Sequence, residues 1–138
     1  MDMVCLYCSG KTKITNSRHQ KRLNQKWRRH TCTDCQAVFT TIESFDPETS
    51  LIVQYGKKQL PFQRELLFVS IYESLRHRPQ AAKEAKALTD TILAQLLPLA
   101  NSATLTRKNI VATTAKTLKN FDKAAHTHYL AFHPIAKN

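Results

Sequence analysis

Glycine is scarce in this sequence, and its scarcity limits the chemistry that the chain supports. Only two glycines occur in 138 residues. The chain therefore lacks the glycine-rich phosphate loop of P-loop hydrolases and the Gly-x-Gly-x-x-Gly fingerprint of dinucleotide-binding enzymes. No motif brings serine, histidine and aspartate together for catalysis. Two of the late histidines, His126 and His128, would point in different directions on a helix. We therefore expect a protein that is not an enzyme.

Long apolar runs are also lacking. No stretch reaches the roughly 20 apolar residues that a transmembrane helix requires, and the first residues carry no apolar signal-peptide segment. We therefore expect no membrane association and a cytosolic location. Thiols stay reduced in that compartment, so paired cysteines favour a metal site over disulfides. With 42% apolar residues, the chain is long enough for one modest core and a small appendage.

Acidic residues are few relative to basic ones. Ten Asp and Glu residues stand against 21 Lys and Arg residues, which gives a formal net charge of +11 and a pI of about 9.8. Such an excess favours a polyanionic partner, namely a nucleic acid, a nucleotide or an anionic surface. A soluble protein with a solvated basic surface would have the same composition, so charge alone does not separate the two interpretations.

All four cysteines belong to two C-x-x-C pairs. "CLYC" supplies Cys5 and Cys8, and "CTDC" supplies Cys32 and Cys35, in the pattern C-x2-C-x23-C-x2-C. Two such pairs provide the four thiolates of a closed tetrahedral zinc site. A redox dithiol or two disulfides are alternatives, although a thioredoxin-like dithiol would need a βαβ context that is missing here. We expect one Zn²⁺ per chain, with a role in folding rather than in catalysis.

The segment between the cysteine pairs is strongly basic and contains no acidic residue. "KWRRHT" is typical of a strand in which Trp27 and Arg29 share one face, and Arg28 and His30 share the other. "VFTTIESF" predicts a closing strand. We therefore expect a three-stranded zinc ribbon with a basic face for phosphates; a solvated charge run is the alternative. The DNA-binding candidates are Arg18, Lys21, Arg22, Lys26, Arg28 and Arg29.

A boundary is expected at "SFDPETS", where Asp46-Pro47 predicts a turn. We place one domain at 1–45 and a second at 46–138. In the second, a short strand at 51–55 precedes a turn and an amphipathic helix. The apolar face of that helix is expected at Phe62, Leu66, Val69 or Ser70, and Glu73 or Leu75. A clean helical stripe follows at Ala81, Ala85, Leu88, Ile92 and Leu96. Thr106 is the expected N-cap of a third helix, and a last short helix runs through Ala125, Tyr129 and Phe132. The predicted fold class is α+β.

Several segments of the sequence together resemble the NrdR family of bacterial transcriptional repressors. They are "CLYC", "ITNSR", "WRRHTCTDCQAVFTTIE", "LPFQRELL", "RHRP" and "FDKAAHTHYLAF", in the family's order. The resemblance implies an N-terminal zinc ribbon joined to an ATP-cone, which is a small helical bundle capped by a short sheet that binds ATP and dATP. It further implies repression of ribonucleotide reductase genes through nucleotide-dependent changes of oligomeric state.

The resemblance also assigns residues, and it shows where this chain departs from the family. Cys5, Cys8, Cys32 and Cys35 match the metal ligands, and Arg18 is kept. Two arginines of the family's run before the second cysteine pair are replaced within Trp27-Arg28-Arg29-His30. In the cone, Gln54 and Leu66 stand where phosphate-binding lysines are expected, and His128 replaces an arginine. The remaining nucleotide-binding candidates are Val53, Lys57, Lys58, Phe62 and Arg64.

The resulting hypothesis is a cytoplasmic, nucleoid-associated bacterial repressor. Its expected partners are double-stranded operator DNA of ribonucleotide reductase genes, adenine nucleotides, and further copies of itself in a homo-oligomer. The alternative is a zinc-ribbon protein that binds RNA or has a structural role, with a helical domain that does not sense nucleotides. Operator specificity and a nucleotide response favour the first. Sequence-blind binding without a nucleotide effect favours the second.

Overall fold

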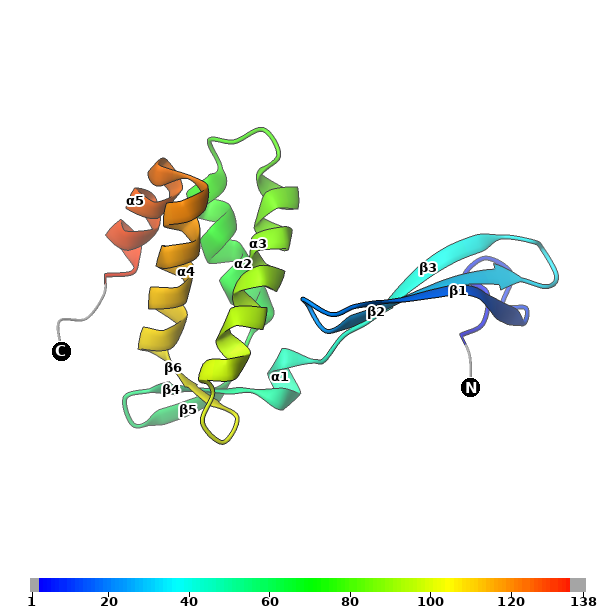
Figure 1. The fold of residues 1–138 in the computed structure, drawn as a ribbon, viewed down its shortest axis with the longest axis horizontal. Helices are drawn as coiled ribbons and strands as arrows, with labels where there is room; N and C mark the ends of the chain where they lie inside the picture. Colours follow the sequence, from blue (N-terminus) through cyan, green and yellow to red (C-terminus); the bar gives the residue numbers. More distant parts are fainter. Residues whose placement is uncertain (1–2, 135–138) are drawn as a thin grey trace. The chain divides into compact units, whose positions relative to one another are not determined.

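The computed structural model describes residues 3–134 and divides into two compact units between Phe45 and Asp46. The first unit holds a three-stranded antiparallel sheet and the two cysteine loops. The second holds helices and a small mixed sheet (Figure 1). The predicted α+β class is confirmed. None of the helices in the described part of the chain is long and apolar enough to cross a membrane.

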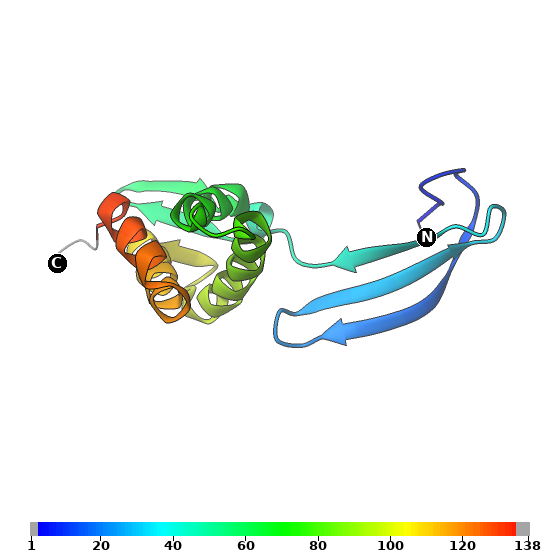
Figure 2. The same cartoon turned by 90° about the horizontal axis from the view of Figure 1, so that it is seen from above.

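The sheet of the first unit, which we call the ribbon, has the strand order β1-β2-β3 (Figure 2). Its pairing contains one irregularity. Ile14 lies opposite His30 and Asn16 lies opposite Arg29, so Thr15 is an extra residue that bulges out of β1. The strands are β1 Thr12–Gln20, β2 Gln25–Cys32 and β3 Val38–Glu43.

The second unit begins with a short helix at the position where a turn was expected. Asp46 caps α1 because its carboxylate accepts a hydrogen bond from the N–H of Glu48 at 3.2 Å, and Pro47 occupies the first turn. A three-stranded sheet in the order β5-β4-β6 follows, with β5 antiparallel and β6 parallel to β4. These elements are α1 Pro47–Ser50, β4 Ile52–Tyr55, β5 Lys58–Pro61 and β6 Thr104–Thr106.

Four helices form the bulk of the second unit, and the small sheet lies across one of their ends (Figure 1). α2 packs against α3 and α5, and α4 packs against the same two helices, so the four enclose one core. The predicted cap is confirmed, since the Thr106 hydroxyl accepts a hydrogen bond from the N–H of Asn109 at 3.0 Å. The helices are α2 Arg64–Leu75, α3 Ala81–Leu96, the 3-10 turn η1 Leu97–Leu99, α4 Arg107–Phe121 and α5 Lys123–Phe132.

The predicted apolar face of α2 is wrong in part. Phe62 and Leu75 are buried, but Leu66 is 62% exposed and Val69 is 50% exposed, and Leu67 and Ile71 are buried instead. The helix begins at Arg64, after Phe62, so a stripe that is counted from Phe62 is out of phase with the helix. The stripe on α3 is largely confirmed, because all its positions except the half-buried Leu88 are buried.

A hub of charged side chains joins the α2–α3 loop to the α4–α5 junction. Arg78 donates two hydrogen bonds to Glu84, at 2.9 and 2.8 Å, and a third to Asp122 at 2.9 Å. Its guanidinium also lies 4.6 Å from the centre of the Phe121 ring. Asp122 in turn caps α5 by accepting from the N–H of Ala125 at 2.9 Å. One carboxylate therefore caps a helix and ties two segments that are distant in the sequence.

We expect Asp122→Ala to destabilise the second unit by about 1–2 kcal/mol, because it removes both an N-cap and a partner of Arg78. The bond from Ala125 and those from His77 and Arg78 hold the pKa of Asp122 well below its ordinary value. This stabilisation is therefore present at neutral pH and is lost as the pH falls below about 4. Urea unfolding of wild type and variant at several pH values measures it. Glu73→Ala, which removes only an exposed pair with Arg76, should change stability by less than about 0.5 kcal/mol. Equal losses in both variants would contradict the assignment.

Candidate metal centre and nucleic-acid interface

The two cysteine loops share one backbone design. The N–H of Cys5 donates to the carbonyl of Gly10 at 2.9 Å, and the N–H of Cys32 donates to the carbonyl of Ala37 at 2.8 Å. In both loops the bond spans five residues and encloses the second cysteine of the pair. Each loop thus closes on itself and turns two sulfur atoms to the same side.

Local geometry after each pair reinforces this likeness. The residue that directly follows the second cysteine has a positive φ in both loops, 64° at Ser9 and 66° at Gln36. The two loops also approach closely, because a Cβ on Gly10 would lie 2.3 Å from a carboxylate oxygen of Asp34. One of the two glycines thus stands where the loops meet.

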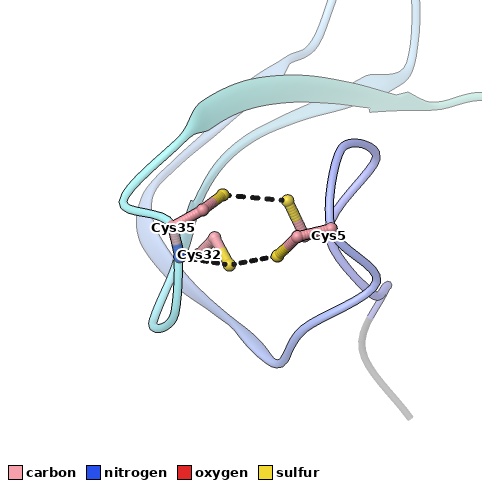
Figure 3. A group of neighbouring side chains, drawn as sticks. Cys5, Cys32 and Cys35 are labelled. Atoms are coloured by element: carbon pink, nitrogen blue, oxygen red, sulfur yellow. Dashed lines mark hydrogen bonds between the residues drawn. The ribbon is translucent and has the colours of Figure 1, made fainter.

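The four sulfur atoms form a compact cluster. All lie within 4.8 Å of one another. The Cys5 and Cys35 sulfurs are 3.7 Å apart (Figure 3), and those of Cys8 and Cys32 are 3.5 Å apart. All four are free thiols, as a metal site requires. A tetrahedral zinc with Zn–S distances of about 2.3 Å places its sulfurs about 3.8 Å apart. The cluster fits that ion in donor type, number and spacing.

The surroundings of the sulfur atoms prepare them unequally for ionisation. The N–H of Cys35 donates to the Cys32 sulfur at 3.4 Å and, against the effect of burial, lowers the pKa of that thiol to about 7. At Cys8 the N–H of Gly10 lowers the pKa, but hydrogen bonds with the Cys32 and Cys35 thiols and burial outweigh it and raise the pKa to about 12. A divalent metal ion bound at this spacing would stabilise all four sulfurs as thiolates.

Strand pairing sorts the side chains of the ribbon onto two faces. Arg18, Trp27 and Ile42 are cross-strand neighbours in one row, and Asn16, Arg29 and Thr40 form the next. We call this side the Trp27 face. It carries no acidic residue among its members, which are Lys13, Asn16, Arg18, Trp27, Arg29, Thr31, Val38, Thr40 and Ile42.

The opposite side of the ribbon, which we call the Arg28 face, holds the small core. His30 and Phe39 are buried and their rings stack at 5.0 Å, while His30 Nε2 lies 2.7 Å from the Thr41 hydroxyl. Arg28 lies on this face and donates to Glu43 at 3.1 Å. The strand pairing thus places Arg28 and Arg29 on opposite faces of the ribbon, as expected. The basic candidates are not all on one face, because alternation sends neighbouring residues to opposite sides.

The remaining predicted DNA contacts lie toward the hairpin end of the ribbon. Lys21 and Arg22 belong to the exposed turn that joins β1 and β2. Lys26 is exposed on the Arg28 face and is paired in register with Glu43. Arg18 and Arg29 are the exposed arginines of the Trp27 face.

The second unit contains a cleft of about 280 Å³ between the small sheet and helices α2, α4 and α5. Two of the predicted nucleotide-binding residues, Val53 and Phe62, line it. Lys57 lies in the turn between β4 and β5, and Lys58 begins β5, so neither borders the cleft itself. Arg64 donates a hydrogen bond to Asp90 of α3 and is also absent from the lining.

Among the lining residues that sequence reasoning missed are Arg107, Tyr129 and His133. Arg107 is the first residue of α4, directly after the Thr106 cap, which is a location suited to an anion. Burial raises the pKa of the Tyr129 hydroxyl, so this group stays a hydrogen-bond donor at neutral pH. The sequence signal that could have identified Arg107 is the Thr106 cap, because the residue after an N-cap lies at the positive end of the helix dipole.

Loss of one thiolate tests the metal centre. We expect Cys32→Ser to release the zinc and unfold the ribbon, while α2 to α5 persist on their own core. Metal analysis of reduced protein and circular dichroism measure the two effects. Leu6→Ser, an exposed change inside the first cysteine loop, is the matched control and should keep one zinc per chain. Wild-type protein without zinc would overturn the assignment.

Comparison with known proteins agrees with the geometry. Residues 3–43 match the family model described as "Transcriptional repressor NrdR-like, N-terminal domain". Proteins named transcriptional repressor NrdR are similar over most of the chain. The one from Methylobacterium sp. (strain 4-46) is 31% identical over 99% of this chain and 72% of its own length. The one from Xanthobacter autotrophicus is 28% identical over 92% and 70%, respectively. The chain therefore belongs to the NrdR family of transcriptional repressors.

Proposed function

We propose that the chain represses ribonucleotide reductase genes by binding double-stranded operator DNA through its ribbon, and that ATP and dATP bound to the second unit control this binding. The observation that carries the proposal is the Trp27 face, an exposed basic surface without acidic residues on a metal-closed ribbon. Phosphates attract such a surface, and exposed arginines contribute both charge and directed hydrogen bonds.

Within the ribbon, Arg18 and Arg29 are the strongest candidates for phosphate contacts. Both are exposed on the Trp27 face. Arg28 is a weaker candidate because Glu43 already accepts its hydrogen bond on the other face. Lys21 and Arg22 extend the basic surface at the hairpin turn, where they would contact the backbone of a neighbouring stretch of DNA.

The cleft of the second unit is the proposed site for an adenine nucleotide. Val53 and Phe62 supply an apolar wall for the base, and Arg107 supplies a permanent positive charge for phosphate. Lys57 and Lys58 lie at the turn between two strands that both line the cleft, and their long side chains would reach phosphates outside it. Arg64 would have to leave Asp90 to take part.

Control by nucleotide would act through the homo-oligomeric state. A ligand shifts an equilibrium between assemblies only when it binds them with different affinity. We therefore propose that dATP favours the assembly that presents the ribbons to the operator. Light scattering with and without ATP and dATP tests this step, and nucleotide binding without any change in mass would contradict it.

The two neighbouring arginines of β2 should behave differently. Arg29→Ala should weaken binding to all DNA sequences, because it removes a phosphate contact. The slope of log affinity against log salt concentration should fall by about one. Arg28→Ala should have a smaller effect, since Glu43 already neutralises that side chain. Fluorescence anisotropy over a salt series, with the ribonucleotide reductase promoter of the source genome and a scrambled duplex, measures both. Equal effects would contradict the assignment of faces. Binding by wild type that ignores both sequence and nucleotide would favour an RNA-binding or structural role.

In the cleft, Arg107→Ala should weaken dATP binding about tenfold or more, the usual effect of removing a hydrogen bond to a charged group. Lys108→Ala is the matched control, because Lys108 is the next residue of α4 and does not line the cleft. Arg64→Ala should have less effect than Arg107→Ala. Calorimetry gives the affinities. No heat with wild type at millimolar ATP or dATP would refute nucleotide binding, whereas binding that is insensitive to Arg107→Ala would refute only this anchor.

A further inference from the structure

The Trp27 face combines two kinds of side chain that phosphate binding alone does not explain. Its arginines are accompanied by apolar residues that remain in solvent, with Ile42 57% exposed and Val38 46% exposed. Trp27 is half-buried and lies in the same row as Ile42 and Arg18. An antiparallel sheet normally turns such residues toward its core. Here the buried side chains of the sheet, His30 and Phe39, lie on the other face.

The apolar and basic residues alternate rather than separate. Arg18 stands directly across from Trp27 on the neighbouring strand, and Arg29 is two residues further along β2 on the same side. A purely electrostatic surface needs no aromatic or branched side chain at its centre. The centre of a protein–protein interface is usually depleted of charged residues. A surface of apolar residues with flanking arginines is complementary to bases with flanking phosphates.

The flat shape of a sheet indicates which part of a nucleic acid it meets. The major groove of DNA is about 12 Å wide and admits a two-stranded β-ribbon, such as the β1–β2 hairpin that carries Arg18, Trp27 and Arg29. Thymine presents a methyl group there for apolar contact. Trp27 is half-buried within its row, so it is better placed to lie against base edges than to act as a protruding wedge between bases.

We infer that Trp27 and Ile42 contact bases in the major groove of bound double-stranded DNA and select thymine by its methyl group, while Arg18 and Arg29 hold the flanking phosphates. The inference rests on the proposed DNA-binding function and assigns its sequence preference to residues that carry no charge.

The chain itself provides the probe, because Trp27 is its only tryptophan. Zinc-loaded full-length protein is titrated with the ribonucleotide reductase promoter duplex of the source genome and with a scrambled duplex. Anisotropy of labelled DNA reports binding, and tryptophan emission reports contact at Trp27. We expect emission to change with the promoter and to saturate together with anisotropy.

Variants separate base contact from phosphate contact. Trp27→Ala should lower affinity for the promoter about tenfold and leave affinity for scrambled DNA and the salt dependence nearly unchanged. Trp27→Phe should restore most of the preference. A promoter duplex with uracil in place of thymine lacks the methyl groups. Wild type should bind it about tenfold more weakly than the normal promoter, whereas Trp27→Ala should bind the two duplexes equally. Ile14→Ala, an exposed apolar change on the Arg28 face, is the control, and zinc content verifies folding.

The inference would be overturned if promoter binding left the tryptophan emission unchanged and Trp27→Ala still preferred the promoter to scrambled DNA as strongly as wild type does. The proposed DNA binding would then still stand. An unaffected uracil duplex would overturn the role of the methyl group. Tighter binding and a larger emission change with single-stranded RNA of the same sequence would overturn it in favour of an RNA-binding module. Absence of binding to any DNA would overturn the proposed function as well.

Discussion

The gathering of four cysteine sulfurs within one small cluster is the constraint on which the ribbon depends. The described part of the first unit buries only Cys5, His30, Cys32 and Phe39, a core too small to hold three strands by the hydrophobic effect alone. Two of these four residues belong to the cysteine cluster. A metal ion bound there would fix the start of β1 and the end of β2 next to the start of β3. Strand pairing extends from that anchor toward the hairpin turn.

The second unit is organised by different forces. Its helices bury an apolar core, and the hub at Arg78 joins loops that the core does not reach. All four cysteines lie in the first unit, so we expect the second unit to keep its fold when the ribbon gains or loses metal. Under the proposed function, loss of metal affects the ribbon first and leaves the second unit able to bind nucleotide.

Local features were predictable from the sequence, and features that depend on distant partners were not. The cysteine spacing identified the metal cluster, and Thr106 identified a helix start, because each C-x-x-C pair and each helix cap is a pattern of residues only three apart. The buried face of α2 was misread because its phase depends on where the helix begins. The pairing of Arg64 with Asp90, and the place of Arg107 in the cleft, depend on how α2, α3 and α4 pack, and no spacing along the chain encodes that packing. The two faces of β2 were predictable from alternation, but the partner of Arg28 was not.

The extra residue at Thr15 has a consequence for how relatives of this chain should be compared. If Thr15 were paired instead of bulged, the pairing that joins Ile14 to His30 would continue evenly and would set Arg18 across from Lys26, on the Arg28 face. With the bulge, Arg18 stands beside Trp27. A relative that lacks Thr15 and has no bulge would keep Arg18 beside Trp27, whereas one that has this residue and pairs it would move the arginine to the other side of the ribbon. Two sequences of equal basicity would then present different surfaces to DNA, and the register of β1 rather than the number of charges decides which surface is presented.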